Sequence, residues 1–600
     1  MNQNKIRNVA IIAHVDHGKT TLVDQLFKQA GSFRDNQEVQ ERLMDSMDLE
    51  KERGITIRSK NGACEYKDHF INIIDTPGHA DFGGEVERVL KMADGALFVV
   101  DAQEGPMPQS YFVLKKAISL ALPVIVVVNK IDKESARPEW VIDQVFDLMV
   151  KLDAPDELLD FKVLYASAKL GKASEDVDIE NKDMSPVLDA VINYIPSPKG
   201  DESSPYKMLV NTIAYSPFLG RLAVGKIHQG TVKTNSEIVV VDEKVSEKKL
   251  RITKIYQFKL DEFEEINQAS VGQIVAVAGL PDIEIGQTIC HPDDTNALKG
   301  VVIDPPTLSM HFLPNDSPFS GQDGEFVTGT QVKERLQKET LSDPALKVKE
   351  NENSPGMMVS GRGELHLSIL IEKMRREGYE FQVSRPKVIL KEEQGQKLEP
   401  YEEVTIEVPE EQMGAVIESL GNRKGVMQNM DQQTGQVQLT YHMPTRGLLG
   451  YQSEFMTLSK GLGTLYHRFL EYRSFTGELK TRKNGVMISK ETCKTIAFAL
   501  CNLQLRGNLF MGPGIDIYEG QVIGETSKDE DMVVNPGKGK KLTNMRASGS
   551  DENVILTPPK LLSLEQLMGF IDDTELLECT PKEIRVRKRI LSESARKASR

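Results

Sequence analysis

The residues with the clearest chemical potential lie near the N-terminus, where an apolar run, 9–13, leads into Gly18-Lys19-Thr20. An apolar strand followed by a tight loop and a helix start is the setting in which backbone N–H groups bind phosphate. Lys19 is expected to reach the β- and γ-phosphates of a nucleotide, and the Thr20 hydroxyl to ligate Mg²⁺. Ala13 stands where such loops usually open with glycine, so its methyl group must fit inside the turn. The residues expected around the phosphates are Asp16, His17, Gly18, Lys19, Thr20 and Thr21.

Three later motifs each follow a predicted strand and complete a nucleotide site. In Asp-Thr-Pro-Gly-His, after the strand 70–74, Asp75 is expected to face Mg²⁺ through water and the Gly78 N–H to meet the γ-phosphate. In Asn-Lys-Ile-Asp, after the all-apolar run 124–128, Asp132 can accept two hydrogen bonds from guanine N1–H and N2–H₂, which adenine does not offer in that arrangement. This pattern favours GTP over ATP. The third motif, Ser-Ala-Lys at 167–169, follows the strand 162–165 and is expected to supply backbone N–H groups for the guanine O6. The residues predicted at the base are Asn129, Lys130, Asp132, Ser167, Ala168 and Lys169.

Taken singly, each motif has an ordinary alternative. Asp75 could begin a turn, Asn129 could cap a strand end, and Ser167 could cap a helix. His14 and His17 could form a metal pair, although ligands at this spacing need a helix and these two precede one. Four motifs in the correct order, each beside a predicted strand, favour the guanine-nucleotide site.

A polar, charge-dense stretch, 34–61, lies between the phosphate loop and Asp75. In a GTPase this is the place of the first switch, where a threonine closes on Mg²⁺ and the γ-phosphate only while that phosphate is present. Thr56, in Glu-Arg-Gly-Ile-Thr-Ile, is the predicted switch threonine and a predicted Mg²⁺ ligand.

Together, the segments 13–20, 53–56 and 75–79 resemble the translational GTPases, the family of elongation factors Tu and G, rather than the Ras type. Only 34 residues separate Asp132 from Ser167, too few for the subdomain that elongation factor G inserts in its GTPase domain. The chain is therefore not expected to be a simple elongation factor G.

The resemblance also implies roles for single residues. In that family the histidine after Asp-Thr-Pro-Gly orients the attacking water when the ribosome's sarcin-ricin RNA presses it inward, so His79 is the implied catalytic residue; the alternative is an exposed turn residue. Val15 and Ile55 resemble the apolar gate that holds this histidine away. Asp16 resembles part of the charge environment that aligns it.

Length and composition indicate a multidomain chain. Its 600 residues exceed what one hydrophobic core supports, and no apolar run approaches the ~20 residues of a membrane span. The N-terminal apolar run suits a buried strand rather than a signal peptide, which predicts a cytoplasmic protein. Five scattered cysteines, never in a Cys-x-x-Cys pair, indicate neither a disulfide framework nor a zinc site.

After a Pro/Ser linker near residue 196, short alternating strands predict a small β-barrel, similar to the second domain of the family. Two runs, 307–391 and 399–472, then each read strand, helix, strand, strand, helix, strand. This repeat predicts two ferredoxin-like domains, which resemble the third and fifth domains of elongation factor G. The segment 386–400 is expected to be only a linker, with no room for that factor's tRNA-mimicking domain.

The barrel, the repeat, the segment 444–451 and a distinctive C-terminal region resemble the TypA/BipA family over essentially the full length, with LepA as the runner-up. We expect a multidomain α/β and β fold. Its predicted domains are a P-loop GTPase domain at 1–200, a β-barrel domain at 201–303, a ferredoxin-like α+β domain at 304–391, a second ferredoxin-like α+β domain at 392–478, and a distinct, family-specific, RNA-contacting C-terminal domain at 479–600.

The charge distribution bears on an RNA partner. A formal net charge of −15 would argue against nucleic acid, because binding phosphate requires local positive potential. However, residues 581–600 carry eight basic and two acidic side chains, and the stretch 537–546 carries four basic residues and no acid. The alternative for this stretch is a solvated loop. The residues predicted to contact RNA are Lys538, Lys540, Lys541 and Arg546.

These patterns predict a ribosome-activated GTPase that binds GTP or GDP with Mg²⁺ and contacts rRNA on the 70S ribosome or its subunits, with tRNA left open as a further partner. It is expected to be a monomer without a membrane partner. The resemblance implies roles in large-subunit assembly, stress and low-temperature adaptation. Two alternatives are a protein that uses GTP only as an affinity switch for the ribosome, and a metabolic P-loop kinase, which the guanine-selecting motif at 129–132 disfavours.

Overall fold

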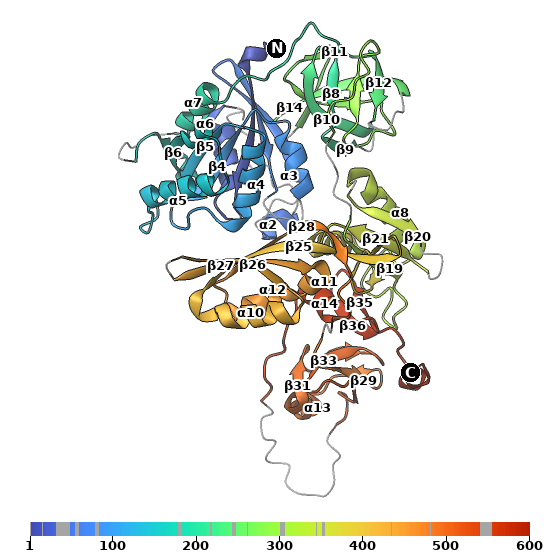
Figure 1. Cartoon of the computed structure of the whole chain (residues 1–600). Helices are drawn as coiled ribbons and strands as arrows, with labels where there is room; N and C mark the ends of the chain where they lie inside the picture. The colour runs from blue at the N-terminus through green and yellow to red at the C-terminus, as the bar shows by residue number, and fades with distance from the viewer. Residues whose placement is uncertain are drawn as a thin grey trace, which may run out of the picture. The chain divides into compact units, whose positions relative to one another are not determined.

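The computed structural model describes residues 2–14, 16–31, 48–53, 59–77, 83–177, 183–216, 219–242, 248–260, 262–300, 306–343, 345–350, 355–433, 435–479, 482–539 and 555–599. The chain divides into two compact units, residues 1–304 with 341–344 and residues 305–340 with 345–600. Figure 1 labels many of the helices and strands of each unit.

The first unit begins with a sheet of order β2-β3-β1-β4-β5-β6-β7, in which β2 and β7 are antiparallel to their neighbours and the other strands run parallel. Helices α1 and α7 pack on one face, and α3, α4 and α5 pack on the other. Burial on both faces explains the near-continuous apolar runs of β4 and β5. The elements are β1 (Ile6–Ala13), α1 (Lys19–Gln29), α2 (Asp48–Arg53), β2 (Lys60–Tyr66), β3 (His69–Asp75), α3 (Gly83–Leu90), β4 (Gly95–Asp101), α4 (Pro108–Ser119), β5 (Val124–Asn129), α5 (Pro138–Lys151), α6 (Asp156–Leu159), β6 (Lys162–Ser167), β7 (Lys172–Ser174) and α7 (Ser185–Tyr194).

A barrel of short strands follows in the same unit and confirms the predicted all-β pattern. Its main path is β13-β12-β18-β8-β10-β17-β14-β15, with β9 paired to β10 and β11 to β16. Its elements are β8 (Lys207–Leu209), β9 (Thr212–Ser216), β10 (Gly220–Gln229), β11 (Thr231–Lys233), β12 (Glu237–Val241), β13 (Lys248–Arg251), β14 (Lys254–Lys259), β15 (Glu262–Ile266), β16 (Gln268–Ser270), β17 (Ile274–Ala278) and β18 (Thr288–Cys290).

The barrel packs directly on the first domain. Tyr256 and Phe258 of β14 share one apolar cluster with Val89 and Leu90 of α3. Beside this cluster lies a polar junction, in which Asp94 pairs with Lys226 of the barrel, Nζ to Oδ1 2.5 Å. Helix α3, which follows the Asp-Thr-Pro-Gly-His motif in the chain, is therefore anchored on the barrel.

The second unit contains the repeat predicted from the sequence. The sheet orders are β20-β21-β19-β22 in the first copy and β26-β27-β25-β28 in the second, which is the same antiparallel arrangement twice. Each copy is a ferredoxin-like α+β domain. The elements are β19 (Leu308–Pro314), α8 (Gly329–Ser342), β20 (Lys347–Glu350), β21 (Met357–Gly361), α9 (Glu364–Arg376), β22 (Phe381–Val383), β23 (Lys387–Val388), β24 (Lys391–Glu393), β25 (Gln396–Pro409), α10 (Met413–Asn422), β26 (Val426–Gln433), β27 (Gln436–Pro444), α11 (Thr445–Leu448), α12 (Tyr451–Leu458) and β28 (Thr464–Ser474).

The C-terminal region forms a small sheet of order β31-β33-β29-β34 and then returns to the first repeat. Strand β35 pairs with β22, and β36 pairs with β35, so the last strands extend the sheet of the first ferredoxin-like domain. The elements are β29 (Val486–Ser489), β30 (Cys493–Lys494), α13 (Ala497–Leu503), β31 (Gly507–Leu509), β32 (Asp516–Ile517), β33 (Val522–Thr526), β34 (Met532–Val534), α14 (Leu564–Phe570), β35 (Glu575–Cys579), β36 (Ile584–Lys588) and α15 (Glu593–Ala598).

One expectation about the connection between the repeats is wrong. The segment 386–400 is not merely a linker, because it contains β23, β24 and the start of β25. Strands β24 and β25 form a hairpin through Gln394 and Gly395, whose φ angles are 52° and 77°. Both angles lie in the left-handed region, as the two-residue turns of tight hairpins require.

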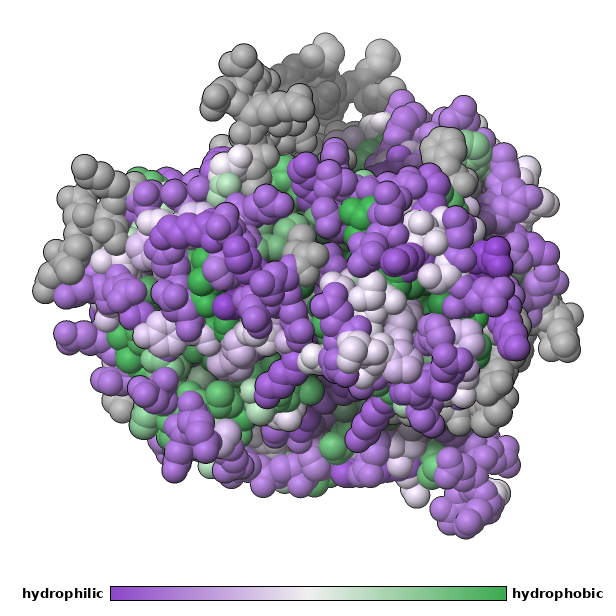
Figure 2. Space-filling model, turned by 90° about the horizontal axis from the view of Figure 1, so that it is seen from above, coloured by the Kyte–Doolittle hydropathy of each residue, from purple (hydrophilic) through white to green (hydrophobic). Residues whose placement is uncertain are grey.

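In the part of the chain that the structure describes, no helix is both long and apolar enough to cross a membrane. Figure 2 shows one face of the molecule, on which hydrophobic residues lie in small groups among hydrophilic ones.

Candidate functional site

The predicted nucleotide motifs meet at one edge of the first sheet. Strands β3, β4, β5 and β6 run parallel, and they end at Asp75, Asp101, Asn129 and Ser167. Strand β1 lies between β3 and β4 and leads into the phosphate loop at this same edge. Ligands of open α/β sheets bind at the carboxyl ends of the strands, so the site lies where such a fold places it.

Asn129 ties the phosphate loop to the segment after β6. Its Nδ2 donates to the His17 carbonyl at 2.8 Å, and its Oδ1 accepts from the Ala168 N–H at 3.0 Å. Gly18 turns the loop with a φ of 89°, and a Cβ at that position would overlap Asn129 Nδ2. Three of the four predicted motifs are thus joined through one buried amide side chain.

Lys130 crosses the loop beside Asn129. Its Nζ donates to the Asp16 carbonyl at 2.5 Å and lies 2.9 Å from Asp101 Oδ2. Both Lys130 and Asp16 adopt a positive φ, 65° and 64°, which is uncommon for residues other than glycine. The contacts of Lys130 hold both strained turns together.

Lys19 and Asp75 lie in contact at the phosphate side of the edge. Lys19 Nζ is 2.8 Å from Asp75 Oδ1 and donates to the Thr76 carbonyl at 2.6 Å, while the Thr76 hydroxyl donates to the Ile11 carbonyl at 2.6 Å. Asp75 is almost fully buried, and Thr20 lies in the first turn of α1. A hydroxyl and a carboxylate are oxygen donors of the kind that Mg²⁺ prefers, so the residues present fit that ion.

The two histidines of the loop belong to its packing. His17 is fully buried, and its Nδ1 accepts a hydrogen bond from the Asp101 N–H at 3.3 Å. The His14 ring stands edge-on to it, with centroids 5.1 Å apart. Burial, and then the neighbouring His17, lowers the pKa of His14 to about 4, so His14 is neutral at pH 7. Because His17 Nδ1 is already occupied, this geometry disfavours the metal-pair alternative.

The residues predicted at the base differ in exposure. Ser167 and Ala168 are buried, and the Ser167 hydroxyl has no hydrogen-bond partner among the described residues. Asp132 and Lys169 are exposed at the same edge. The exposed Asp132 carboxylate and the buried Ser167 hydroxyl offer polar groups to a ligand placed between the segments after β5 and β6. Thr21 is exposed on α1.

Several predicted residues lie outside the described residues, namely Val15, Ile55, Thr56, Gly78, His79, Lys540, Lys541 and Arg546. The chain that flanks Ile55 and Thr56 is held on both sides. Lys60 pairs with the buried Glu50 at 2.6 Å, and the Ser59 N–H and hydroxyl both donate to Glu85 of α3 at 2.8 Å.

The structure places the C-terminal basic residues in two settings. Lys538 is exposed in the segment that follows β34. The basic residues of β36 are paired instead: Arg585 lies 3.2 Å from both Asp323 and Glu578, and Lys588 lies 2.8 Å from Glu575. Much of the positive charge counted in the sequence at 581–600 therefore stabilises the fold.

Sequence reasoning missed Asp101 and Glu104. Asp101 pairs with Lys130 of the predicted motif, and Glu104 lies 3.5 Å from His17 Nε2. The position of Asp101 in the sequence could have revealed it. Asp101 directly follows the all-apolar run 95–100, just as Asp75 and Asn129 follow apolar strands.

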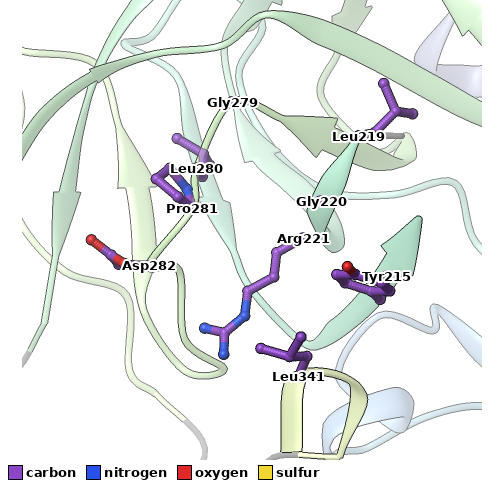
Figure 3. A pocket seen from close by; sticks show the side chains of 9 residues that line it. All are labelled: Tyr215, Leu219, Gly220, Arg221, Gly279, Leu280, Pro281, Asp282 and Leu341. Atoms are coloured by element: carbon purple, nitrogen blue, oxygen red, sulfur yellow. The ribbon is translucent and has the colours of Figure 1, made fainter. Parts of the chain in front are cut away.

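A separate hollow lies on the barrel, beside the turn between β9 and β10 and the loop after β17 (Figure 3). Tyr215, Leu219 and Arg221 line one side of it, and Pro281 and Asp282 lie across from them. Among the described residues, none of those predicted to bind nucleotide lines this hollow.

Comparisons with known proteins agree with this architecture. Two curated relatives are each named "Large ribosomal subunit assembly factor BipA": that of Salmonella typhimurium is 52% identical over 99% of this chain and 98% of its own, and that of Haemophilus influenzae is 50% identical over 99% of this chain and 97% of its own. A solved crystal structure of a protein from Thermus thermophilus shares the fold with a TM-score of 0.57, at 18% identity over 79% of this chain and 98% of that one.

Five family models match segments of the chain between residues 4 and 593. The matches are Elongation factor Tu GTP binding domain at 4–197, Elongation factor Tu domain 2 at 220–290, Elongation Factor G, domain III at 328–385, Elongation factor G C-terminus at 396–483 and TypA/BipA C-terminal domain at 484–593. The chain is a GTPase, and it belongs to the TypA/BipA family of translational GTPases.

Proposed function

We propose that this GTPase binds the ribosome in its GTP state, is activated there, and leaves after hydrolysing GTP to GDP and phosphate. The observation that carries the proposal is the sheet edge at which Asn129 and Lys130 join three nucleotide motifs, in a chain of this family. The full-length relatives are named large ribosomal subunit assembly factors, which supports a ribosomal partner and a role in assembly of the large subunit.

Each nucleotide residue has a role in this proposal. Backbone N–H groups from Asp16 to Thr21 hold the phosphates at the N-terminus of α1, and Lys19 counters their charge. Asp132 accepts hydrogen bonds from guanine, while Ser167, Ala168 and Lys169 border its O6 edge. Mg²⁺ would be held by Thr20, Thr56 and, through water, Asp75, and when bound it neutralises charge on the β- and γ-phosphates.

Hydrolysis is assigned to His79 by family resemblance. His79 positions the attacking water, Val15 and Ile55 hold the side chain back until the ribosome is bound, and the Gly78 N–H meets the γ-phosphate. Loss of that phosphate releases Thr56 and with it the switch segment, whose flanking residues Ser59 and Lys60 are anchored on Glu85 and Glu50.

RNA contact is assigned to the loop that begins after β34. Lys538 is exposed there, and Lys540, Lys541 and Arg546 follow it without an intervening acid. Phosphate binding needs such local positive charge in a chain with a net charge of −15. The proposed partner is rRNA of the 70S ribosome or its subunits, with tRNA as a further candidate. The protein is proposed to be a cytoplasmic monomer. Its proposed domain boundaries are those expected from the sequence. A role in stress and low-temperature adaptation rests on family resemblance alone.

Two alternatives differ from this proposal, one in the process that the protein serves and the other in the role of hydrolysis. A LepA-like factor would act during translation rather than assembly. A GTP-switched binding protein would need the nucleotide only for affinity. The match of the TypA/BipA C-terminal domain at 484–593 favours the proposed assembly role over a LepA-like one.

Cosedimentation with ribosomes tests the proposal. We expect the chain to pellet with ribosomes with a non-hydrolysable GTP analogue and to remain largely in the supernatant with GDP. Replacing Lys538 and Lys541 with glutamate should weaken pelleting severalfold and make its salt dependence shallower. Lys528→Glu changes charge at another exposed lysine of the same region and should pellet normally. Equal pelleting in both nucleotide states would contradict the switch, and unchanged pelleting of the double variant would contradict the RNA contact.

A further inference from the structure

We propose that Asp101 is a positioning residue of the nucleotide site. Through Lys130 and His17 it holds the phosphate loop in the shape that retains a guanine nucleotide, and Glu104 supports this arrangement from the other side of His17. The inference rests on the nucleotide site proposed above and adds the groups that set how long the nucleotide stays bound.

The first contact is between carboxylate and lysine. Asp101 is fully buried at the end of β4, and its Oδ2 lies 2.9 Å from Lys130 Nζ and 3.1 Å from Lys133 Nζ. Lys130 Nζ also donates to the Asp16 carbonyl. Asp101 therefore fixes the end of a side chain that spans the phosphate loop, and charge-assisted hydrogen bonds of this kind are the strong ones.

The second contact is through the backbone. The Asp101 N–H donates to His17 Nδ1, and the other ring nitrogen, Nε2, faces Glu104 Oε2 at 3.5 Å. The Asp101 carboxylate in turn accepts the N–H groups of Gln103 and Glu104, at 2.7 and 3.4 Å. The end of β4 and the segment after it therefore contact both nitrogens of the buried His17 ring. The His17 backbone carbonyl in turn accepts the hydrogen bond from Asn129.

Electrostatics argue for a specific role. A buried carboxylate near a site for phosphates repels the ligand and is costly to desolvate, so on charge alone Asp101 would be unfavourable there. The cost of burying the Asp101 carboxylate is offset by its ion pairs with Lys130 and Lys133, and Lys130 also crosses the phosphate loop. A residue needed only to end a strand could be neutral. The charge at this position is therefore explained by the positioning of Lys130.

The test measures release of fluorescently labelled GDP and GTP from the full chain after addition of excess unlabelled nucleotide. Asp101→Asn should speed release of both nucleotides, by about tenfold for GDP, because Lys130 loses the charged partner that fixes it across the phosphate loop. Hydrolysis of the GTP that remains bound is measured separately in a single turnover, so that nucleotide release is not confused with the chemical step.

The chain offers matched controls. Lys133→Met removes an ion pair with Asp101 but no contact with the loop, and it should change release by less than about twofold. Asp101→Asn combined with Lys133→Met keeps the local net charge of the unsubstituted chain and should still release nucleotide about as fast as Asp101→Asn. If Asp101→Asn does not fold, Glu104→Gln, at a half-exposed side chain, is expected to speed release about threefold.

Three results would overturn the inference: release from Asp101→Asn at the unsubstituted rate, equal acceleration by Lys133→Met alone, or, where Asp101→Asn does not fold, no acceleration by Glu104→Gln. Failure of the unsubstituted chain to bind GDP would instead overturn the nucleotide site itself.

Discussion

At the residue scale, the proposed nucleotide site depends on a few positions where a single added carbon atom would change the geometry. Gly18 is the clearest, because its backbone is left-handed and its missing side chain leaves room for Asn129. Asn129 cannot move aside freely, since it bridges His17 and Ala168. The site is therefore sensitive to added volume here in a way that an ordinary turn is not.

Gly18→Ala is expected to weaken GDP binding by at least about a hundredfold, because the methyl group displaces Asn129 and strains the loop. Gly31→Ala is the matched control: Gly31 also has a positive φ, 67°, but no described atom lies within 4 Å of where its Cβ would stand. That variant should lose only about 1 kcal/mol of stability and bind GDP normally. Equilibrium titration with labelled GDP measures both, and equal affinities for the two variants would contradict the geometry.

His228 of the barrel predicts a pH dependence of stability. Burial, and then the nearby Lys226, lowers the pKa of His228 to about 4, and its Nε2 has no hydrogen-bond partner among the described residues. The unfolded chain takes up this proton near pH 6.5 and the folded chain only near pH 4. The free energy of unfolding of the first unit should therefore fall as the pH drops from about 6.5 towards 4.

His228→Gln should flatten this decline, because the side chain that takes up a proton only in the unfolded chain over this range is then absent. Thermal unfolding between pH 4 and pH 8 measures the effect. An unchanged pH slope in His228→Gln would show that this side chain titrates alike in both states.

The sequence predicted most residues of this edge because each stands in a short motif after an apolar strand. Asp101 and Glu104 belong to no such motif, and their roles arise from pairing in space, Asp101 with Lys130 and Glu104 with His17. Spacing along the chain could not reveal these pairs, since Lys130 follows Asp101 only after α4 and β5 have intervened.

At the element scale, α3 and the barrel share one apolar cluster, and a buried charge pair lies beside it. Asp94 also accepts a hydrogen bond from Asn8 at 2.7 Å, and Asn8 donates to the Gly272 carbonyl at 3.0 Å. The Asp94 and Lys226 side chains are only 11% and 7% exposed. Removing one partner leaves the other charged and buried.

Asp94→Ala is therefore expected to destabilise the first unit by about 3–5 kcal/mol. The double variant Asp94→Asn with Lys226→Met should cost clearly less than Asp94→Ala, because neither charge is then left alone. Glu237→Gln breaks an exposed pair with Arg251 on the same barrel and should cost less than about 1 kcal/mol. Denaturant unfolding measures all three. A double variant as unstable as Asp94→Ala would contradict the coupling.

The repeat in the second unit was predictable because its helices and strands carry clear apolar periods. The hairpin of β24 and β25 was not, since β24 is Lys-Glu-Glu and has no apolar face. The return of β35 and β36 to the sheet of the first repeat was not predicted either. No strands were predicted in this region, and local pattern could not have identified β22, about 190 residues earlier, as the partner of β35.

At the scale of the whole molecule, this return means that the C-terminal region is not a simple appendage. Glu578 of β35 is buried and accepts hydrogen bonds from Ser317 and Tyr518, both at 2.6 Å. It thereby joins the first repeat to the C-terminal sheet. The family-specific end of the chain and the first repeat are expected to fold together.

A chain that ends at residue 571 should lose cooperative unfolding of the second unit, because β22 would lose its neighbour β35. A chain that ends at residue 591 keeps β35 and β36 and loses only the terminal segment that contains α15, so it should unfold like the full chain. Limited proteolysis and circular dichroism on heating compare the two. Native-like unfolding of the shorter chain would contradict this interdependence.

Ribosome-dependent hydrolysis is the property on which the proposed function depends most. The decisive experiment is GTP turnover by the purified chain with and without 70S ribosomes, for the unsubstituted protein, His79→Ala and the control His69→Ala. We expect ribosomes to stimulate turnover on the order of a hundredfold or more, and we expect the stimulation to be lost in His79→Ala and kept in His69→Ala. Absence of stimulation, or stimulation that survives His79→Ala, would contradict a ribosome-activated mechanism through this histidine.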